Sequence, residues 1–280
     1  MKLIPPQIQH YIKGHSDLAR VSRNVGWITL ERAIRLLIGL FVMSLLARYL
    51  GPEDFGLLSL GIAIISMSIP FTELGLQGVI IKAHVENPQD TSLIVGTVFS
   101  LRLIGALIST AVAIGIALFI PSSDTQLLIV VVLLAFTAIF RTSDSFKHIF
   151  EARVLSKPVV LAELAASLIT SAIKIGAILA GFTVLSFALI QSIEFAIAAA
   201  CILVTYRHHI GKISDLRFSL SRAIEFLRLG WPLFLSFLSV TIYMRTDQLM
   251  ISTLLGKTEV GIYSIAVRLS EVWHFVPVSI

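Results

Sequence analysis

Eight stretches of apolar residues divide this sequence, and each is long enough to cross a lipid bilayer as an α-helix. They fall at residues 26–50, 56–81, 92–120, 125–146, 159–181, 183–205, 226–255 and 259–280. A helix needs about 20 mostly apolar residues to span the hydrocarbon core. The chain is 14% charged, whereas soluble domains are about a quarter charged. The sequence therefore predicts an all-α, polytopic membrane helix bundle of about eight transmembrane helices.

Basic residues concentrate in the N-terminal tail and in alternate links between these stretches. The intervening links contain only Arg48 and Lys257. Loops rich in lysine and arginine stay in the cytoplasm, so we expect the N-terminus there. The tail and the basic links contain Lys2, Lys13, Arg20, Arg23, Lys82, Arg102, Arg141, Lys147, Arg153, Lys157, Arg207, Lys212, Arg217, Arg222 and Arg228.

An internal repeat relates the first two stretches to the last two. Residues 50–59 resemble residues 255–264: in both, a Leu-Gly pair ends one stretch, and an acidic residue followed by a glycine begins the next. The copies are six stretches apart, an even number, so both have the same orientation. The repeat is therefore predicted to be parallel, related by an axis along the membrane normal.

The repeat suggests a domain organisation. Residues 1–25 form a basic cytoplasmic tail, or an amphipathic helix on the membrane surface, and both interpretations stay open. Residues 26–205 form a six-helix N-terminal lobe, and residues 206–225 form a basic cytoplasmic linker. Residues 226–280 supply the first two helices of a second lobe, so we expect the chain to be a fragment of a longer protein.

Ionisable residues inside the apolar stretches are the candidate functional residues, because each costs about 2.5–3.5 kcal/mol near the centre of a lipid-facing helix. Arginine is suited to phosphate, which its guanidinium binds through two parallel hydrogen bonds. The candidates for substrate binding are Arg32, Arg35, Lys174 and Arg245. Two alternatives stay open: Arg32 and Arg35 extend to the inner headgroups, or Arg245 forms an interhelical salt bridge. The candidates for cation coupling are Asp247, Glu163 and Glu194.

Two segments resemble the Wzx-type lipid-linked oligosaccharide flippases, polysaccharide biosynthesis (export) proteins of the multidrug/oligosaccharidyl-lipid/polysaccharide flippase superfamily. They are residues 46–56, LARYLGPEDFG, and residues 245–248, RTDQ, with the Leu-Gly and Val-Gly-Ile-Tyr that follow. The resemblance implies two six-helix lobes in the cytoplasmic (inner) membrane. It also implies alternating access that moves an undecaprenyl-pyrophosphate-linked oligosaccharide between leaflets. The implied partners are that substrate, membrane lipids and other polysaccharide assembly proteins, but no nucleic acid.

Motifs of other functional classes are missing from the sequence. There is no glycine-rich phosphate loop of the Walker type, and the adjacent His208 and His209 cannot face one metal site from a helix. The single cysteine, Cys201, excludes an internal disulfide framework. We expect no enzymatic activity, cofactor or metal. The alternatives are a drug/cation antiporter of the same superfamily, which should have an acidic cavity, and a membrane-embedded enzyme of envelope synthesis.

Overall fold

The computed structural model of the protein describes residues 6–120 and 125–271; within these ranges, side chains are described from residue 26 to residue 270, except Ile28. The described residues form helices and no strand. The helices are α1 (Pro6–Glu73), α2 (Leu76–Glu86), η1 (Pro88–Asp90), α3 (Thr91–Phe119), α4 (Thr125–Arg141), α5 (Asp144–Ala152), α6 (Lys157–Leu179), α7 (Val184–His209), η2 (Ile213–Asp215), α8 (Leu220–Leu254) and α9 (Lys257–Glu271).

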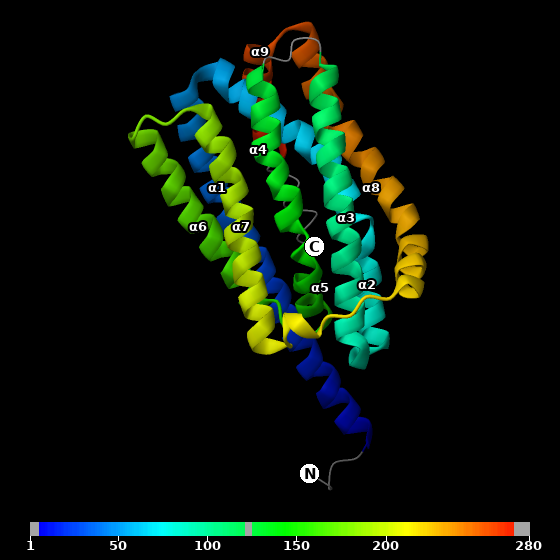
Figure 1. Ribbon diagram of the computed structural model, residues 1–280. Coiled ribbons are helices and arrows are strands. Elements are labelled where there is room, and N and C mark those ends of the chain that lie inside the picture. Colours follow the sequence, from blue (N-terminus) through cyan, green and yellow to red (C-terminus); the bar gives the residue numbers. More distant parts are fainter. Residues whose placement is uncertain (1–5, 121–124, 272–280) are drawn as a thin grey trace.

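Glycines in the left-handed conformation reverse the chain at one end of the bundle. Gly51 (φ 73°, ψ 174°) divides α1 into two helices that run in opposite directions, and Pro52 begins the second one. Gly181 (φ 76°) and Gly256 (φ 97°) lie in the turns after α6 and α8. Only glycine adopts these dihedrals without a steric penalty from Cβ. These three turns lie at the end of the bundle opposite the N-terminus, which we call the far end (Figure 1).

The links richest in basic residues, 82–102, 141–157 and 206–222, lie at the other end, which we call the N-side end (Figure 1). The helices therefore cross the bundle in the alternating order that the basic links predict. That the N-side end faces the cytoplasm stays a prediction. Residues 6–25 continue α1 as a helix beyond the N-side end of the bundle, and residues 1–5 lie outside the described residues.

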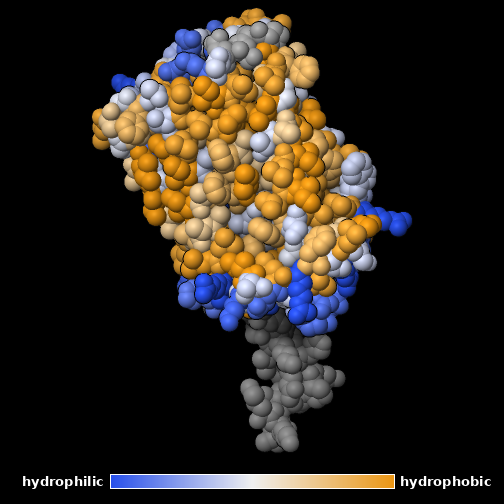
Figure 2. All heavy atoms as spheres, viewed as in Figure 1, coloured by the Kyte–Doolittle hydropathy of each residue, from blue (hydrophilic) through white to orange (hydrophobic). Residues whose placement is uncertain are grey.

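Apolar side chains cover the middle of the bundle surface, as a membrane protein requires. Figure 2 shows a broad hydrophobic surface between the two ends, with hydrophilic side chains gathered at the N-side end. Six helical stretches of the described residues are long and apolar enough to cross a membrane. The first, Thr29–Glu86, contains the reversal at Gly51 and therefore supplies two crossings. The protein is thus a multi-pass, all-α membrane bundle.

The last predicted crossing, residues 259–280, extends past the described residues. Of it, α9 (Lys257–Glu271) covers only residues 259–271, and residues 272–280 lie outside the described ranges. An eighth complete crossing therefore stays a prediction, as does the division into one complete lobe and part of another.

Within the second predicted stretch, the chain breaks where the sequence indicated a continuous helix. Leu74 and Gly75 both have positive φ (52° and 65°), and α2 restarts at Leu76. Gly75 packs directly against the backbone of Gly230 in α8, and a Cβ on Gly230 would lie 2.7 Å from the Leu74 carbonyl oxygen. The break allows the backbones of α2 and α8 to touch near the N-side end.

Small residues also bring α3 close to the second half of α1, as their four-residue spacing predicts. Gly105 lies against the backbone of Phe71, and Ser109 donates a 3.0 Å hydrogen bond to the hydroxyl of Ser68. Ala113 and Ala117 are fully buried on the same stripe.

The two copies of the repeat meet at the far end through equivalent atoms. A Cβ on Gly56 would collide with the Lys257 carbonyl oxygen and lie 3.0 Å from the nitrogen of Gly261. A Cβ on Gly261 would collide with the Pro52 carbonyl oxygen and lie 3.1 Å from the nitrogen of Gly56. In the repeat Gly56 corresponds to Gly261 and Pro52 to Lys257, so exchanging the two copies turns one of these contacts into the other, and the contact has local twofold symmetry. This geometry agrees with a parallel duplication and with an axis running between the two ends of the bundle.

Candidate functional site

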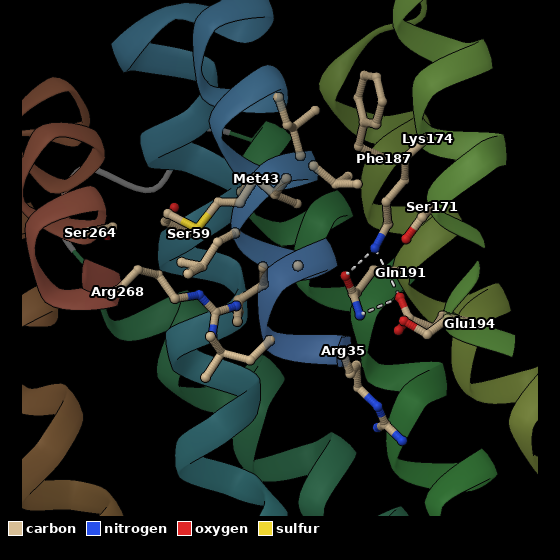
Figure 3. A pocket seen from close by; sticks show the side chains of 18 of the residues that line it. Arg35, Met43, Ser59, Ser171, Lys174, Phe187, Gln191, Glu194, Ser264 and Arg268 are labelled. Carbon is tan, nitrogen blue, oxygen red and sulfur yellow. Dashed lines mark hydrogen bonds and ion pairs between the residues drawn. The ribbon is translucent and has the colours of Figure 1, made fainter. Parts of the chain in front are cut away.

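A cavity of about 560 Å³ lies between the two copies of the repeat, toward the N-side end from the Gly56–Gly261 contact. Helices α1, α5, α6, α7, α8 and α9 all contribute to its wall, and Figure 3 shows part of it. Its charged and amide-bearing lining residues are Glu31, Arg32, Arg35, Lys147, Glu163, Lys174, Gln191, Glu194, Arg245, Gln248 and Arg268. All four residues predicted to bind substrate therefore line one cavity.

Charged residues of three helices meet in a cluster near the N-side end of the cavity. The guanidinium of Arg35 on α1 pairs with Glu31, one turn earlier, and its Nη2 lies 3.2 Å from Glu163 Oε2 on α6. The other carboxylate oxygen of Glu163, Oε1, lies 2.7 Å from Lys147 Nζ on α5. The pairing of Glu31 with Arg35 follows from their i,i+4 spacing. The contacts of Glu163 arise only from tertiary packing.

A second cluster joins α6 to α7 further along the cavity. Lys174 Nζ donates to Glu194 Oε2 at 2.9 Å and to Gln191 Oε1 at 3.1 Å. In Figure 3 these three side chains point toward one another, while Arg35 points away from them. Lys174 lies eleven residues after Glu163 on the same helix, which places the Cα atoms of these two residues about 16 Å apart along its axis. The cavity is therefore charged at two levels.

Helices α8 and α9 add the cations Arg245 and Arg268 to the opposite wall. Figure 3 shows Arg268 on α9 across the cavity from the Lys174 cluster. Arg268 and Arg32 are exposed, and neither makes an ion pair within the described part of the chain. Arg32 stands beside the Arg35 cluster, so one arginine on each wall, Arg32 and Arg268, is open to a ligand in the cavity.

The repeat extends into the cavity wall beyond the segment in which the two sequences resemble one another. With the same offset, Leu40 corresponds to Arg245, Met43 to Gln248, Ser59 to Ser264, Ile62 to Val267, and Ala63 to Arg268. Both members of every pair line the cavity. The local twofold axis therefore passes through the cavity. With the predicted axis along the crossing direction, Arg245 is expected at the depth of Leu40, five residues beyond Arg35 on α1. The first copy is mostly apolar at these positions, whereas the second provides two arginines and a glutamine.

The wall of the cavity toward the far end is apolar. Leu46, Phe55, Leu58 and Phe187 line the cavity there and are themselves buried. They lie between the charged walls and the Gly56–Gly261 contact. The charged clusters of the cavity thus lie closer to the N-side end than these apolar side chains.

The three carboxylates predicted as candidates for cation coupling have different surroundings. Glu163 and Glu194 line the cavity, and both are paired with cations. Asp247 is not among the lining residues: it accepts a hydrogen bond from the Tyr263 hydroxyl on α9 and one of 2.7 Å from the backbone N–H of Gln248. Cation coupling through these residues stays a prediction. Among the described residues, no group of three or more His, Cys, Asp or Glu side chains is placed to hold a metal ion.

Several charges within the apolar stretches serve packing away from the cavity. Arg141 Nη2 on α4 lies 2.6 Å from Glu73 Oε1 at the end of α1, and neither residue lines the cavity. Arg102 on α3 is 1% exposed, and its Nη2 lies 3.3 Å from His148 Nε2, whose Nδ1 contacts Glu151. These groups pair with one another at the N-side end and leave the cavity charges as a separate set.

A comparison of the sequence with known families matches nearly the whole chain. A family model described as "Polysaccharide biosynthesis protein" matches residues 21–278. The chain belongs to this family. No significant match was found among curated proteins or solved structures. The family and the helix bundle together identify a multi-pass membrane protein of polysaccharide biosynthesis.

Several members of this cavity were not among the residues that the sequence singled out for substrate binding. Lys147 lies in a basic link that the sequence used only for orientation, and Gln191 carries no charge. Arg268 is an ionisable residue within the last apolar stretch, which is the signal by which the sequence could have selected it. For this polysaccharide biosynthesis protein, the described residues of the cavity thus include six cationic side chains (Arg32, Arg35, Lys147, Lys174, Arg245 and Arg268) and three carboxylates (Glu31, Glu163 and Glu194).

Proposed function

We propose that this protein is a flippase for an undecaprenyl-pyrophosphate-linked oligosaccharide in envelope polysaccharide synthesis. In this proposal the N-side end faces the cytoplasm, and the lipid headgroup enters the cavity from the inner leaflet of the cytoplasmic membrane. Alternating access between the two halves related by the repeat then exposes the headgroup to the outer leaflet. The protein carries out no chemical reaction. The lipid-linked oligosaccharide is its partner in the cavity, and other assembly proteins supply and use it.

The single observation that carries the proposal is that cationic side chains outnumber carboxylates among the described residues lining the cavity, and that Arg32 and Arg268 are exposed there without an ion pair. Unpaired charges are expensive at membrane depth, so a positive cavity favours an anionic occupant. A pyrophosphate diester is such an occupant, and guanidinium groups bind its oxygens in pairs. The cavity volume of about 560 Å³ is within the usual range for small-molecule sites, roughly 300–1,000 Å³.

The residues proposed to contact the substrate are those whose side chains line the cavity from both walls. Arg245 and Arg268 on the side of α8 and α9, with Lys174, form the deeper level. Arg32 and Arg35 form the level near the N-side end. Serines on α6, Ser167 and Ser171, line the same cavity and can bond to sugar hydroxyls.

The same observation argues against the alternatives. A drug/cation antiporter would attract cationic substrates with carboxylates, whereas here cations outnumber carboxylates by two to one. Like charges brought together in a medium of low dielectric repel strongly. For a membrane-embedded enzyme, the described cavity residues supply no nucleophile with an adjacent base.

Substitution of Arg245 tests the proposal. In the full-length protein, Arg245→Ala should abolish envelope polysaccharide export while membrane insertion and protein level stay unchanged. Arg245→Lys should restore export only in part, because lysine keeps the charge but loses the bidentate geometry. Normal export by Arg245→Ala at normal expression would remove Arg245 from the site. A collapse of expression would identify it as a structural ion pair instead.

A further inference from the structure

One cavity carboxylate, Glu163, occupies the position that an anionic ligand would take. Its two oxygens are divided between cations of two other helices, with Oε2 at 3.2 Å from Arg35 Nη2 and Oε1 at 2.7 Å from Lys147 Nζ. Its side chain is 12% exposed and faces the cavity. A phosphate group bridging Arg35 and Lys147 would make these same two contacts with two of its oxygens.

We propose that Glu163 is a displaceable internal counter-ion: the anionic group of the substrate replaces its carboxylate on Arg35 and Lys147, and the carboxylate returns when the substrate leaves. The inference deepens the proposed function and rests on it. It assigns to Glu163 a positioning role that is distinct from direct binding of substrate.

The energetic reason for an internal counter-ion concerns the protein without bound substrate. Alternating access requires the cavity to return without substrate, and uncompensated cations inside the membrane cost several kcal/mol each. A carboxylate that bridges two of them lowers this cost. The same carboxylate competes with the bound anion, which keeps binding weak enough for release, a condition that any conducting or transporting site must meet.

The neighbouring carboxylates are less suited to this exchange. Glu31 is 4% exposed and is held one helical turn from Arg35 on the same helix, so it stays with Arg35 whether or not a ligand is bound. Glu194 pairs with Lys174 alone, and Gln191 lies within hydrogen-bond distance of both. Of the three cavity carboxylates, only Glu163 bridges cations from two other helices.

The first test measures binding of inorganic pyrophosphate to the purified full chain by isothermal titration calorimetry. Glu163→Gln removes the competing charge and keeps the size of the side chain, so affinity should rise about tenfold, equivalent to roughly 1.4 kcal/mol. The control is Glu225→Gln, which removes a carboxylate from an ion pair with Arg222 outside the cavity and should leave affinity unchanged. In an export assay, Glu163→Gln should lower the maximal rate while apparent affinity does not fall, because release and the empty return are slowed.

The second test uses the wild-type protein and therefore does not depend on the variant folding. A hydrophobic carbodiimide labels carboxyl groups that are not held in ion pairs, and mass spectrometry locates the label. Saturating pyrophosphate should raise labelling at Glu163 and leave Glu73, whose ion pair lies outside the cavity, unchanged.

The outcomes separate the inference from the proposed function. Pyrophosphate binding to wild type without tighter binding to folded Glu163→Gln, or without increased labelling of Glu163, would overturn the counter-ion role and leave the anion site intact. Absence of pyrophosphate binding to both proteins, together with normal export by Arg245→Ala, would overturn the proposed function itself.

Discussion

The glycine contact at the far end gives the sharpest structural prediction, because it is the place where the two copies of the repeat touch. We expect Gly56→Ala and Gly261→Ala to weaken closure of the far end. Each methyl would collide with a carbonyl oxygen and would lie 3.0 or 3.1 Å from a backbone nitrogen, whereas ordinary contacts of a Cβ are 3.4–4 Å. The neighbouring atoms are backbone and cannot rotate away, so the two helices must separate.

The size of the effect follows from the cost of overpacking. Adding a methyl group to a tight contact costs about 1–3 kcal/mol. If this cost falls only on the conformation with the far end closed, the equilibrium shifts by roughly 5–150-fold toward the open one. Gly39→Ala is the matched control, since Gly39 also lies on α1 and lines the cavity but has no atom within 4 Å of an added Cβ.

Accessibility of the cavity from the outside measures this shift. Ser59→Cys, in a background with Cys201→Ser, places one thiol in the cavity wall. An impermeant maleimide applied to intact cells should label this thiol roughly 5–150 times faster when Gly56→Ala or Gly261→Ala is added. Adding Gly39→Ala should leave the labelling rate unchanged. Equal rates in all four proteins would refute the assignment of this contact as the closure.

Three further substitutions test the topology and the role of the ion pairs outside the cavity. Ser214→Cys should be protected from the same reagent in intact cells, and Thr183→Cys should be labelled. The two positions lie at opposite ends of the bundle, and the basic links place the N-side end inside. The reverse labelling pattern would invert the orientation. Arg141→Ala should lower the melting temperature, because it leaves the carboxylate of Glu73 without its partner. The cost reaches roughly 3–5 kcal/mol for fully buried pairs and is smaller for this partly exposed one. The pyrophosphate affinity of the folded protein should stay unchanged; a loss of affinity with an unchanged melting temperature would place Arg141 in the site.

The helical architecture could be predicted from the sequence because one physical requirement dominates it. Apolar stretches of bilayer length must form helices, since unpaired backbone groups are not tolerated in lipid. The ends of α3, α6 and α7 accordingly lie within a few residues of the predicted stretches, and the turns fall at Gly51, Gly181 and Gly256. The break at Leu74 and Gly75 was missed because its cause is the close approach of α8, which is far away in the sequence.

The cavity could be predicted in part. The energetic cost of intramembrane charges selected Arg35, Lys174 and Arg245, and the structure places all three in one cavity. The same rule applies equally to Glu73 in the second apolar stretch, which pairs with Arg141 away from the cavity. Cost alone does not distinguish a charge that faces a ligand from one that is paired inside the bundle, because both avoid lipid. Which residue pairs with which, as in the contacts of Glu163 with Arg35 and Lys147, depends on the packing of several helices.

The central claim is that the charged cavity carries the headgroup of a lipid-linked oligosaccharide across the membrane. The most direct measurement reconstitutes the full-length protein in proteoliposomes with a fluorescent undecaprenyl-pyrophosphate-linked oligosaccharide and follows its exposure on each side with a membrane-impermeant quencher. Wild type should transfer the lipid between leaflets, so that the quencher reaches nearly all of the label. With Arg245→Ala, quenching should stop near the fraction of label in the outer leaflet, as it does in protein-free liposomes. Equal transfer by wild type and Arg245→Ala, or transfer by wild type no faster than in protein-free liposomes, would contradict the account.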